Sequence, residues 1–223
     1  MRMRRKKNLG SRFSKCKLIA LAKSTDIYRL EEKDRYDLVD YKKLFNNDNP
    51  IEIEIGCGKG QFLIEHAKRR KDVNFIGVEI IDNVIVSAAE NAEKENLTNI
   101  QFFNCGAEIL HYLIPPNSVD KIYLNFSCPY PKKQYENHRL TYYHFLNIYK
   151  IILKSGAKIL MKTDSDSLFE FSKQSFVENG FTLTNVEEDL YKNLPIDNIA
   201  TEYEEKFVKE GKKIHALTAH VKE

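Results

Sequence analysis

Hydrophobic and polar positions follow two different periods along the chain from Ile51 onward. Short apolar runs bounded by turn residues predict buried strands, and apolar residues spaced three and four apart predict amphipathic helices. Alternating strands and helices are typical of an α/β fold with a mostly parallel sheet covered on both faces. The last strand is expected to be antiparallel, at the end of the sheet. The expected strands are 51–55, 74–80, 100–104, 120–124, 157–163, 181–186 and 213–221, and the expected helices are 61–70, 84–95, 140–153 and 167–179.

The segment before this pattern differs in character. Residues 1–45 are expected to form a basic N-terminal arm or appendage, and residues 46–223 the main domain. A basic arm commonly contacts phosphate, and a solvated, disordered tail is the alternative interpretation. The first seventeen residues contain no acid, and their basic side chains are Arg2, Arg4, Arg5, Lys6, Lys7, Arg12, Lys15 and Lys17.

Composition narrows the class of protein. The chain has 223 residues, 42% of them hydrophobic and 30% charged, which predicts one large globular domain with a sizeable core. A net charge of +3 does not by itself indicate nucleic acid. No apolar run approaches the ~18 residues that span a bilayer, and no hydrophobic segment typical of a secretory signal follows the basic start. We therefore expect a cytoplasmic protein without a membrane segment, as a monomer or a homodimer. The four cysteines are widely spaced without a CxxC pair, so no metal site is expected.

A glycine-rich turn follows the first expected strand of this domain. Gly56, Gly58 and Gly60 permit a tight turn in which a ligand can touch the backbone, and Glu79 ends the next strand. A carboxylate there can accept hydrogen bonds from both ribose hydroxyls of NAD, FAD or S-adenosylmethionine. The G-x-G-x-G spacing lacks the pyrophosphate fingerprint, and Glu54 would repel a pyrophosphate but suit a sulfonium or amino group. The pattern therefore favours S-adenosylmethionine, whereas a strand-end or N-cap role for Glu54 and an ion pair for Glu79 are the structural alternatives.

A stiff loop follows the fourth of these strands. It reads Asn125-Phe-Ser-Cys-Pro-Tyr-Pro-Lys-Lys133, and two prolines cannot lie in a sheet because each lacks an N–H and has a fixed φ. The loop presents the aromatic ring of Tyr130 beside Lys132 and Lys133. A ring next to cations suits a stacked base beside a phosphate, and a proline-stiffened surface turn is the alternative interpretation.

Several segments in this order resemble the bacterial tRNA (guanine-N7)-methyltransferases over nearly the whole chain. The resemblance implies a class I, Rossmann-like methyltransferase fold, S-adenosylmethionine as donor, and guanosine 46 in the tRNA variable loop as acceptor. The segments are Met1-Arg-Met-Arg4, Glu54-Ile-Gly-Cys-Gly-Lys-Gly60, Phe75-Ile-Gly-Val-Glu79, the Asn125–Lys133 loop, Arg139-Leu-Thr141, Lys162-Thr-Asp164 and Thr201-Glu-Tyr-Glu-Glu-Lys-Phe207.

The resemblance also implies a site. Guanine N7 has a free lone pair and no proton, so methyl transfer needs positioning rather than a general base. Asp164 and Glu204 are the candidates for accepting hydrogen bonds from the N1–H and N2–H₂ groups of a flipped guanine. N-capping of the next helix is the alternative for Asp164, although Asp166 or Ser167 can fill that role, and a capping box is the alternative for Thr201 and Glu204. The implied donor residues are Glu54, Gly56, Gly58, Gly60, Glu79, Gly106 and Cys128; the implied acceptor residues are Lys132, Asp164, Thr201, Glu202, Tyr203 and Glu204; and Cys128, Asp164 and Glu204 are the candidate catalytic residues.

The chain departs from the family at several of these positions. Cys128 stands where the family usually has an acid, and Tyr130 where it has a tryptophan. Gly106 stands where a second acid is typical, with Glu108 two residues on. The basic run after the lysines is thinner, and only Arg139 remains of it. These departures favour a weakened or altered enzyme, with a tRNA- or donor-binding homologue without useful turnover, or a small-molecule methyltransferase, as alternatives.

Overall fold

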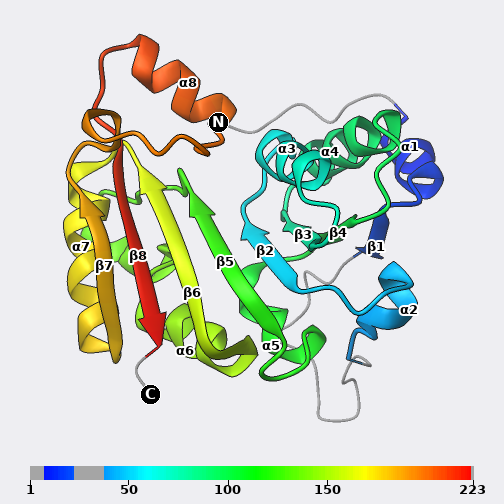
Figure 1. The fold of residues 1–223 in the computed structure, drawn as a ribbon, viewed down its shortest axis with the longest axis horizontal. Coiled ribbons are helices and arrows are strands. Elements are labelled where there is room, and N and C mark those ends of the chain that lie inside the picture. The colour runs from blue at the N-terminus through cyan, green and yellow to red at the C-terminus, as the bar shows by residue number, and fades with distance from the viewer. Residues whose placement is uncertain (1–7, 23–37, 222–223) are drawn as a thin grey trace.

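A single mixed sheet organises the computed structural model, which describes residues 8–22 and 38–221 (Figure 1). Its eight strands have the order β1-β4-β3-β2-β5-β6-β8-β7. Neighbouring strands from β1 to β6 are parallel, and β8 is antiparallel to both β6 and β7. The expected α/β fold with a mostly parallel sheet is therefore confirmed. The strands are β1 (Ile19–Ala22), β2 (Ile51–Ile55), β3 (Asn74–Val78), β4 (Ile100–Asn104), β5 (Val119–Asn125), β6 (Leu153–Thr163), β7 (Phe181–Glu187) and β8 (His215–Val221).

Helices cover the sheet in two layers (Figure 1). The helices α1, α3 and α4 pack on one face, and α5, α6 and α7 pack on the other, so that each face has its own hydrophobic core. None of the helices in the described residues is long and apolar enough to cross a membrane. The helices are α1 (Leu9–Lys15), α2 (Tyr41–Phe45), α3 (Gln61–Arg69), α4 (Asp82–Lys94), α5 (Leu110–Leu113), α6 (Tyr143–Ile152), α7 (Asp166–Glu178) and α8 (Glu202–Lys209).

The strand β2 shows why the sheet is buried on both faces. Its isoleucines lie in the core beneath α5, α6 and α7, and because side chains alternate along a strand, Glu52 and Glu54 point to the opposite face. Glu52 is buried and accepts hydrogen bonds from Arg70 at 2.8 Å and from the Tyr123 hydroxyl at 2.8 Å, and it forms an ion pair with Lys121 at 2.9 Å. Burial alone would raise the pKa of Glu52, but these partners outweigh burial and lower it. The buried charge is thereby compensated.

The position of the last strand differs from the expectation. The strand β8 is antiparallel as expected, but it lies between β6 and β7 rather than at the end of the sheet. Thr218 is paired with Leu160 of β6 on one side and with Thr184 of β7 on the other. The edge strand is β7, whose residues after Phe181 are mostly exposed or half-buried. A hydrophobic pattern indicates how buried a strand is, but it does not predict which strands pair with it.

The N-terminal segment contributes to this domain wherever the structure describes it. The strand β1 extends the sheet by pairing with β4, and Arg12 of α1 makes a bidentate contact with Glu90 of α4 at 2.7 and 2.6 Å. Phe45 at the end of α2 is buried in the core. Residues 8–22 and 38–45, expected in an appendage, thus pack against the sheet and its helices. Residues 1–7 and 23–37 of the expected basic arm lie outside the described residues.

Candidate active site

The expected site residues gather at the carboxyl ends of the parallel strands. The chain leaves β2 toward β3 on one side, and the later strand β5 lies on the other side of β2. Ligands of open α/β sheets bind at such a switch point, outside the carboxyl ends of the strands. In Figure 1, α8 lies above this edge of the sheet. The glycine turn, the proline loop and the start of α8 meet there.

The glycine turn has the backbone that its sequence predicts. Gly56, Gly58 and Gly60 have φ values of 79°, 57° and 78°, in the left-handed region that favours glycine. A Cβ at Gly56 or Gly58 would enter open space, so a ligand can approach the backbone there. Gly60 is the N-cap of α3, and a Cβ at Gly60 would crowd Ala88 at 3.1 Å. The first two glycines therefore leave room for a ligand, and the third allows α3 to pack against α4.

Glu54 is a buried carboxyl group with one unsatisfied oxygen. Its Oε1 accepts a hydrogen bond from the Asn125 amide at 2.9 Å, whereas Oε2 has no hydrogen-bond partner among the described residues. Burial raises the pKa of Glu54 to about 8, although Asn125 and the charge of Lys162 act in the opposite direction. Glu54 is thus neither an N-cap nor a solvated strand end. A buried acceptor without a partner is suited to a cationic group of a ligand.

Glu79 braces the glycine turn from the neighbouring strand. Its carboxylate accepts hydrogen bonds from the N–H of Gly58 at 3.3 Å and from the N–H of Ile81 at 2.9 Å. Burial raises the pKa of Glu79, and these backbone donors partly offset that effect. No cation is paired with Glu79 within the part of the chain that the structure describes, so the ion-pair alternative is not observed there. The free lone pairs of the carboxylate remain able to accept ribose hydroxyls.

A small cavity of about 70 Å³ brings the two halves of the expected site together. Its donor-side lining includes Glu54, Gly56 and Gly58, and its acceptor-side lining includes Thr201 and the start of α8. An ion pair of 3.0 Å between Lys59 and Glu202 joins the glycine turn to α8. The remaining residues that line the small cavity are Cys57, Lys59, Gln61, Phe62, Asn125, Phe126, Glu202 and Tyr203.

The Thr201–Glu204 segment is a helix start held by a buried ion pair. Thr201 is the N-cap of α8 and accepts a hydrogen bond from the N–H of Glu204 at 3.0 Å, so the Thr201 half of the expected capping box is present. The Glu204 side chain is fully buried, and it accepts from Lys162 at 2.9 Å, Asn198 at 2.9 Å and Tyr191 at 3.2 Å. Its carboxylate is therefore already engaged by the protein. In this arrangement Glu204 anchors α8 to β6 instead of presenting a free carboxylate to a base.

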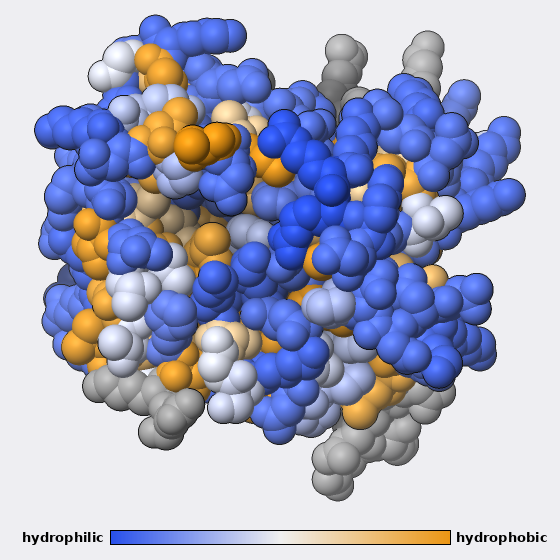
Figure 2. Space-filling model, viewed as in Figure 1, coloured by the Kyte–Doolittle hydropathy of each residue, from blue (hydrophilic) through white to orange (hydrophobic). Residues whose placement is uncertain are grey.

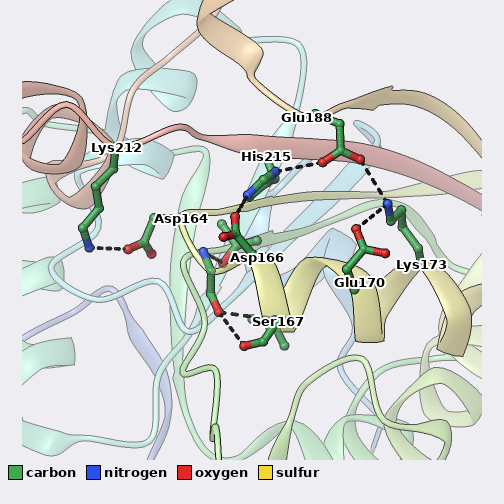
Figure 3. Close-up of polar contacts among 11 residues, drawn as sticks. Asp164, Asp166, Ser167, Glu170, Lys173, Glu188, Lys212 and His215 are labelled. Carbon is green, nitrogen blue, oxygen red and sulfur yellow. Dashed lines mark hydrogen bonds and ion pairs between the residues drawn. The ribbon is translucent and has the colours of Figure 1, made fainter.

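Asp164 lies at the end of β6, beside a cluster of charged residues (Figure 3). Its carboxylate contacts Lys212 at 2.7 Å, and the Lys212 ammonium lies 4.0 Å from the centre of the Phe207 ring. The N-cap of α7 is Ser165, whose hydroxyl accepts from the N–H of Leu168. The capping alternatives for Asp164, Asp166 and Ser167 are therefore wrong, because Ser165 fills that role. Asp164 keeps a half-buried carboxylate with one cationic partner.

The proline loop is held by a residue whose role the sequence did not reveal. Phe126 and Tyr130 both have positive φ, at 50° and 40°, which is strained for residues with a side chain. The buried Arg139 donates to the carbonyls of Pro129 at 3.1 Å and Tyr130 at 3.0 Å. Arg139 was expected to be the remnant of a basic RNA-binding run, but it supports the loop from below. The exposed residues of this segment are Cys128, Pro131, Lys132 and Lys133.

A larger cavity of about 780 Å³ opens on the sheet face that α3 covers only in part. It lies over β5, β6 and β8, and it shares Phe62 and Asn125 with the small cavity. Figure 2 views this face, where hydrophilic residues predominate and apolar residues show between them. The cations that line it include Lys121 and Lys162, each paired with a buried glutamate. Sequence patterns did not predict this cavity, since it depends on how the loop before α8 crosses the sheet.

The donor side of the site fits S-adenosylmethionine. The unsatisfied oxygen of Glu54 suits the positive charge of that molecule, and the open space at Gly56 and Gly58 admits it to the backbone. Glu79 stands at the strand end where ribose hydroxyls are recognised. Within residues 8–22 and 38–221, no group of three or more His, Cys, Asp or Glu side chains is placed to hold a metal ion.

Comparisons with known proteins identify the family to which this chain is similar. Residues 48–217 match the methyltransferase family model Methyltransf_4. The tRNA (guanine-N(7)-)-methyltransferase of Bacillus subtilis is 45% identical over 180 residues, which cover 79% of this chain and 84% of that protein. The enzyme of the same name from Oceanobacillus iheyensis is 42% identical over 179 residues, covering 80% and 84%.

Solved structures share the fold at low sequence identity. An antibiotic-related methyltransferase has a TM-score of 0.62 and 17% identity, covering 86% of this chain and 95% of that one. The 16S rRNA methyltransferase KamB has a TM-score of 0.61 and 15% identity, covering 84% and 96%.

Sheet order, glycine turn and strand-end acids together define a class I, S-adenosylmethionine-dependent methyltransferase. The sequence identity to the matched relatives, and the share of each chain that the match covers, identify the family within this class. The chain belongs to the tRNA (guanine-N7)-methyltransferase family.

Proposed function

We propose that this protein transfers the methyl group of S-adenosylmethionine to N7 of guanosine 46 in the tRNA variable loop, in the cytoplasm. The observation that carries the proposal is the small cavity in which Glu54 and the glycine turn meet Thr201 and the start of α8. Relatives named as tRNA (guanine-N7)-methyltransferases support the choice of acceptor. When bound, S-adenosylmethionine supplies an electrophilic methyl group on a sulfonium.

The residues on the donor side bind and orient. Glu54 offers its unsatisfied oxygen to the positive charge of the donor, and the glycine turn admits the donor to the backbone. Glu79 accepts the ribose hydroxyls while it holds the turn through Gly58. Guanine N7 carries no proton, so no residue has to act as a general base. Alignment of the two reactants is then the main contribution to the rate.

On the acceptor side, the carboxylate of Asp164 is the group proposed to read guanine. It can accept hydrogen bonds from N1–H and N2–H₂ together, which selects guanine over adenine. Its contact with Lys212 keeps the carboxylate at the surface of the site until a base arrives. The exposed Lys132 suits a phosphate, and Tyr203 offers a half-exposed ring beside the cavity. Cys128 has no carboxylate to contribute, so positioning rests on the other groups.

The test is methyl transfer from labelled S-adenosylmethionine to unmodified tRNA, with the modified base mapped. We expect label at N7 of guanosine 46 and none in a tRNA with adenosine at that position. Asp164→Asn should lower the rate about ten- to a hundredfold, because a charged hydrogen bond is worth roughly 1.5–3 kcal/mol. Asp72→Asn is the control, since Asp72 is an exposed acid in the turn before β3, at the amino end of that strand.

The outcomes separate the alternatives. Label on another nucleotide, or an Asp164→Asn variant as fast as the control, would contradict the proposed acceptor site. Tight tRNA binding without any label would instead identify a binding homologue that has lost the reaction.

A further inference from the structure

The turn that carries Asp164 is held by two residues of the segment that leads into β8 (Figure 3). Lys212 contacts the Asp164 carboxylate itself at 2.7 Å. The ring Nε2 of His215, at the start of β8, lies 2.6 Å from Oδ1 of Asp166, the first residue of α7. An ionised carboxylate has no proton to donate, so the imidazole is the donor of this hydrogen bond. Two separate contacts thus join residues 212–215 to the turn after β6.

The His215 ring is fixed by its surroundings. Only 5% of its side chain is exposed, and the ring stacks on Phe169 of α7 with the centroids 4.6 Å apart and 18° between the planes. Its Nδ1 lies 3.5 Å from the Glu188 carboxylate, which Lys173 contacts in turn at 3.0 Å. The Asp166 side chain, by contrast, is 89% exposed. The histidine is therefore the fixed member of the pair, and Asp166 takes its position from it.

The same histidine lies beside the residue that precedes Asp164. The backbone of His215 is paired with Thr163 at the end of β6. The Thr163 hydroxyl accepts a hydrogen bond from the N–H of Ser165 at 3.1 Å, and Ser165 is the N-cap of α7. Contacts of His215 therefore flank Asp164 on both sides in the sequence. The position of the Asp164 backbone depends on them.

We infer that His215 is a positioning residue, which sets through Asp166 the place where the Asp164 carboxylate meets guanine. Hydrogen bonds from N1–H and N2–H₂ together require both carboxylate oxygens to lie within reach and near the plane of the base. A turn displaced by about 1 Å would still present a negative charge, but it would not meet both donors at once. This inference rests on the role of Asp164 in the proposed function.

The competing explanation is that the contact between His215 and Asp166 only stabilises the fold. Asp166 lies in the first turn of α7, where the helix dipole favours a carboxylate whatever its partner. Loss of the contact would then lower the free energy of unfolding and the amount of active protein. It would not change the choice of base. A ratio of rates with two bases separates the explanations, because the concentration of folded enzyme cancels from it.

The experiment compares kcat/KM for tRNA with guanosine at position 46 and for the same tRNA with inosine there. Inosine keeps N1–H and N7 but lacks the 2-amino group, so the wild type should prefer guanosine about ten- to a hundredfold. Asp166→Ala, at an exposed position, and His215→Ala should each lower this preference about tenfold. His215→Gln should restore most of it, because the amide of glutamine can donate to Asp166 in place of the imidazole.

His220→Ala is the matched control. His220 lies on the same strand, but it contacts Thr184 of β7 at 3.0 Å and not the turn after β6, so the preference should stay unchanged. Affinity for S-adenosylhomocysteine, measured by titration calorimetry, should be the same in every variant, because the proposed donor residues Glu54 and Glu79 lie at the ends of β2 and β3. The double variant of Asp166 and His215 should discriminate no worse than either single variant, since both act through one contact.

Two results would overturn the inference. One is that Asp166→Ala and His215→Ala keep the wild-type preference, and the other is that His215→Gln discriminates no better than His215→Ala. Either would leave methyl transfer to guanosine 46, and so the proposed function, unaffected. A wild-type protein that methylates guanosine and inosine at equal rates would instead contradict the reading of guanine by Asp164, and the inference with it.

Discussion

At the residue scale, the candidate active site contains a buried side chain with a polar atom that lacks a hydrogen-bond partner. Glu54 is the clearest case, because its carboxyl group is buried, half-satisfied by Asn125, and has a pKa raised to about 8 by burial. An isolated ionised carboxylate in such a place would be costly. The group is therefore mostly protonated at neutral pH until a cationic ligand arrives. Burial of the Glu54 carboxyl group lowers the stability of the protein, but it also leaves an acceptor that can bind the positive charge of the donor strongly.

Binding of S-adenosylmethionine at pH 7 should release a proton from Glu54. The empty protein holds the proton because the pKa is about 8, and the positive ligand favours the ionised form. Calorimetry in two buffers with different heats of ionisation measures this release. It should disappear in Glu54→Gln, with affinity about ten- to a hundredfold lower. An equal release from Glu54→Gln at pH 7 would contradict the assignment.

At the scale of elements, α8 is placed by contacts with β6 and the glycine turn. Glu204 is bound by Lys162 from β6, Thr201 caps the helix, and Glu202 reaches Lys59. The start of α8 lines the small cavity, so the position of this helix determines the shape of the site. The sequence motif identified the segment, but the buried ion pair explains why an acid is needed at position 204.

Disruption of the Lys162–Glu204 ion pair should therefore loosen the packing of α8 against β6. Lys162→Met and Glu204→Gln should each lower the free energy of unfolding, by roughly 3–5 kcal/mol for a full loss of one partner, and each should weaken S-adenosylhomocysteine binding without tRNA. Denaturant unfolding and calorimetry measure the two effects. Glu205→Gln is the control on the exposed side of the helix. If Glu204→Gln slowed methyl transfer while stability stayed unchanged, Glu204 would be a direct guanine contact.

At the scale of the whole molecule, the first and the last described strands, β1 and β8, belong to the same sheet. Among the described strands, β1 lies at one edge beside β4, whereas β8 lies inside and pairs with β6 and β7. The last strand in the sequence is therefore required to connect β7 to the rest. Because its partners lie far away in sequence, β8 can be placed only when the sheet is nearly complete.

Removal of these two strands should have different consequences. A chain that ends at Gly211 lacks β8, and we expect it not to fold, since β6 and β7 lose their shared partner. A chain that begins at residue 23 lacks the edge strand β1 and helix α1 but keeps the other described elements, and it should fold with reduced stability. Circular dichroism and cooperativity of thermal unfolding distinguish the two. Cooperative unfolding of the chain ending at Gly211 would show that β8 is dispensable.

Much of the site was accessible from local sequence. Glycine spacing predicted the tight turn at Gly56, Gly58 and Gly60, and the strand-end position of Glu79 followed from the same pattern. The roles of Arg139 and Lys162 were not accessible, because each contacts a segment that comes close to it only when the chain folds. Burial and pairing of polar side chains depend on several elements at once.

The sequence by itself determined the α/β order of elements, the glycine turn and the family, since hydrophobic period, turn chemistry and motif spacing are local properties of the chain. Only the tertiary structure decided that β8 lies inside the sheet and that Glu204 anchors α8. These features depend on which distant segments pack together. That is set by burial and pairing across the whole fold, which no local pattern contains.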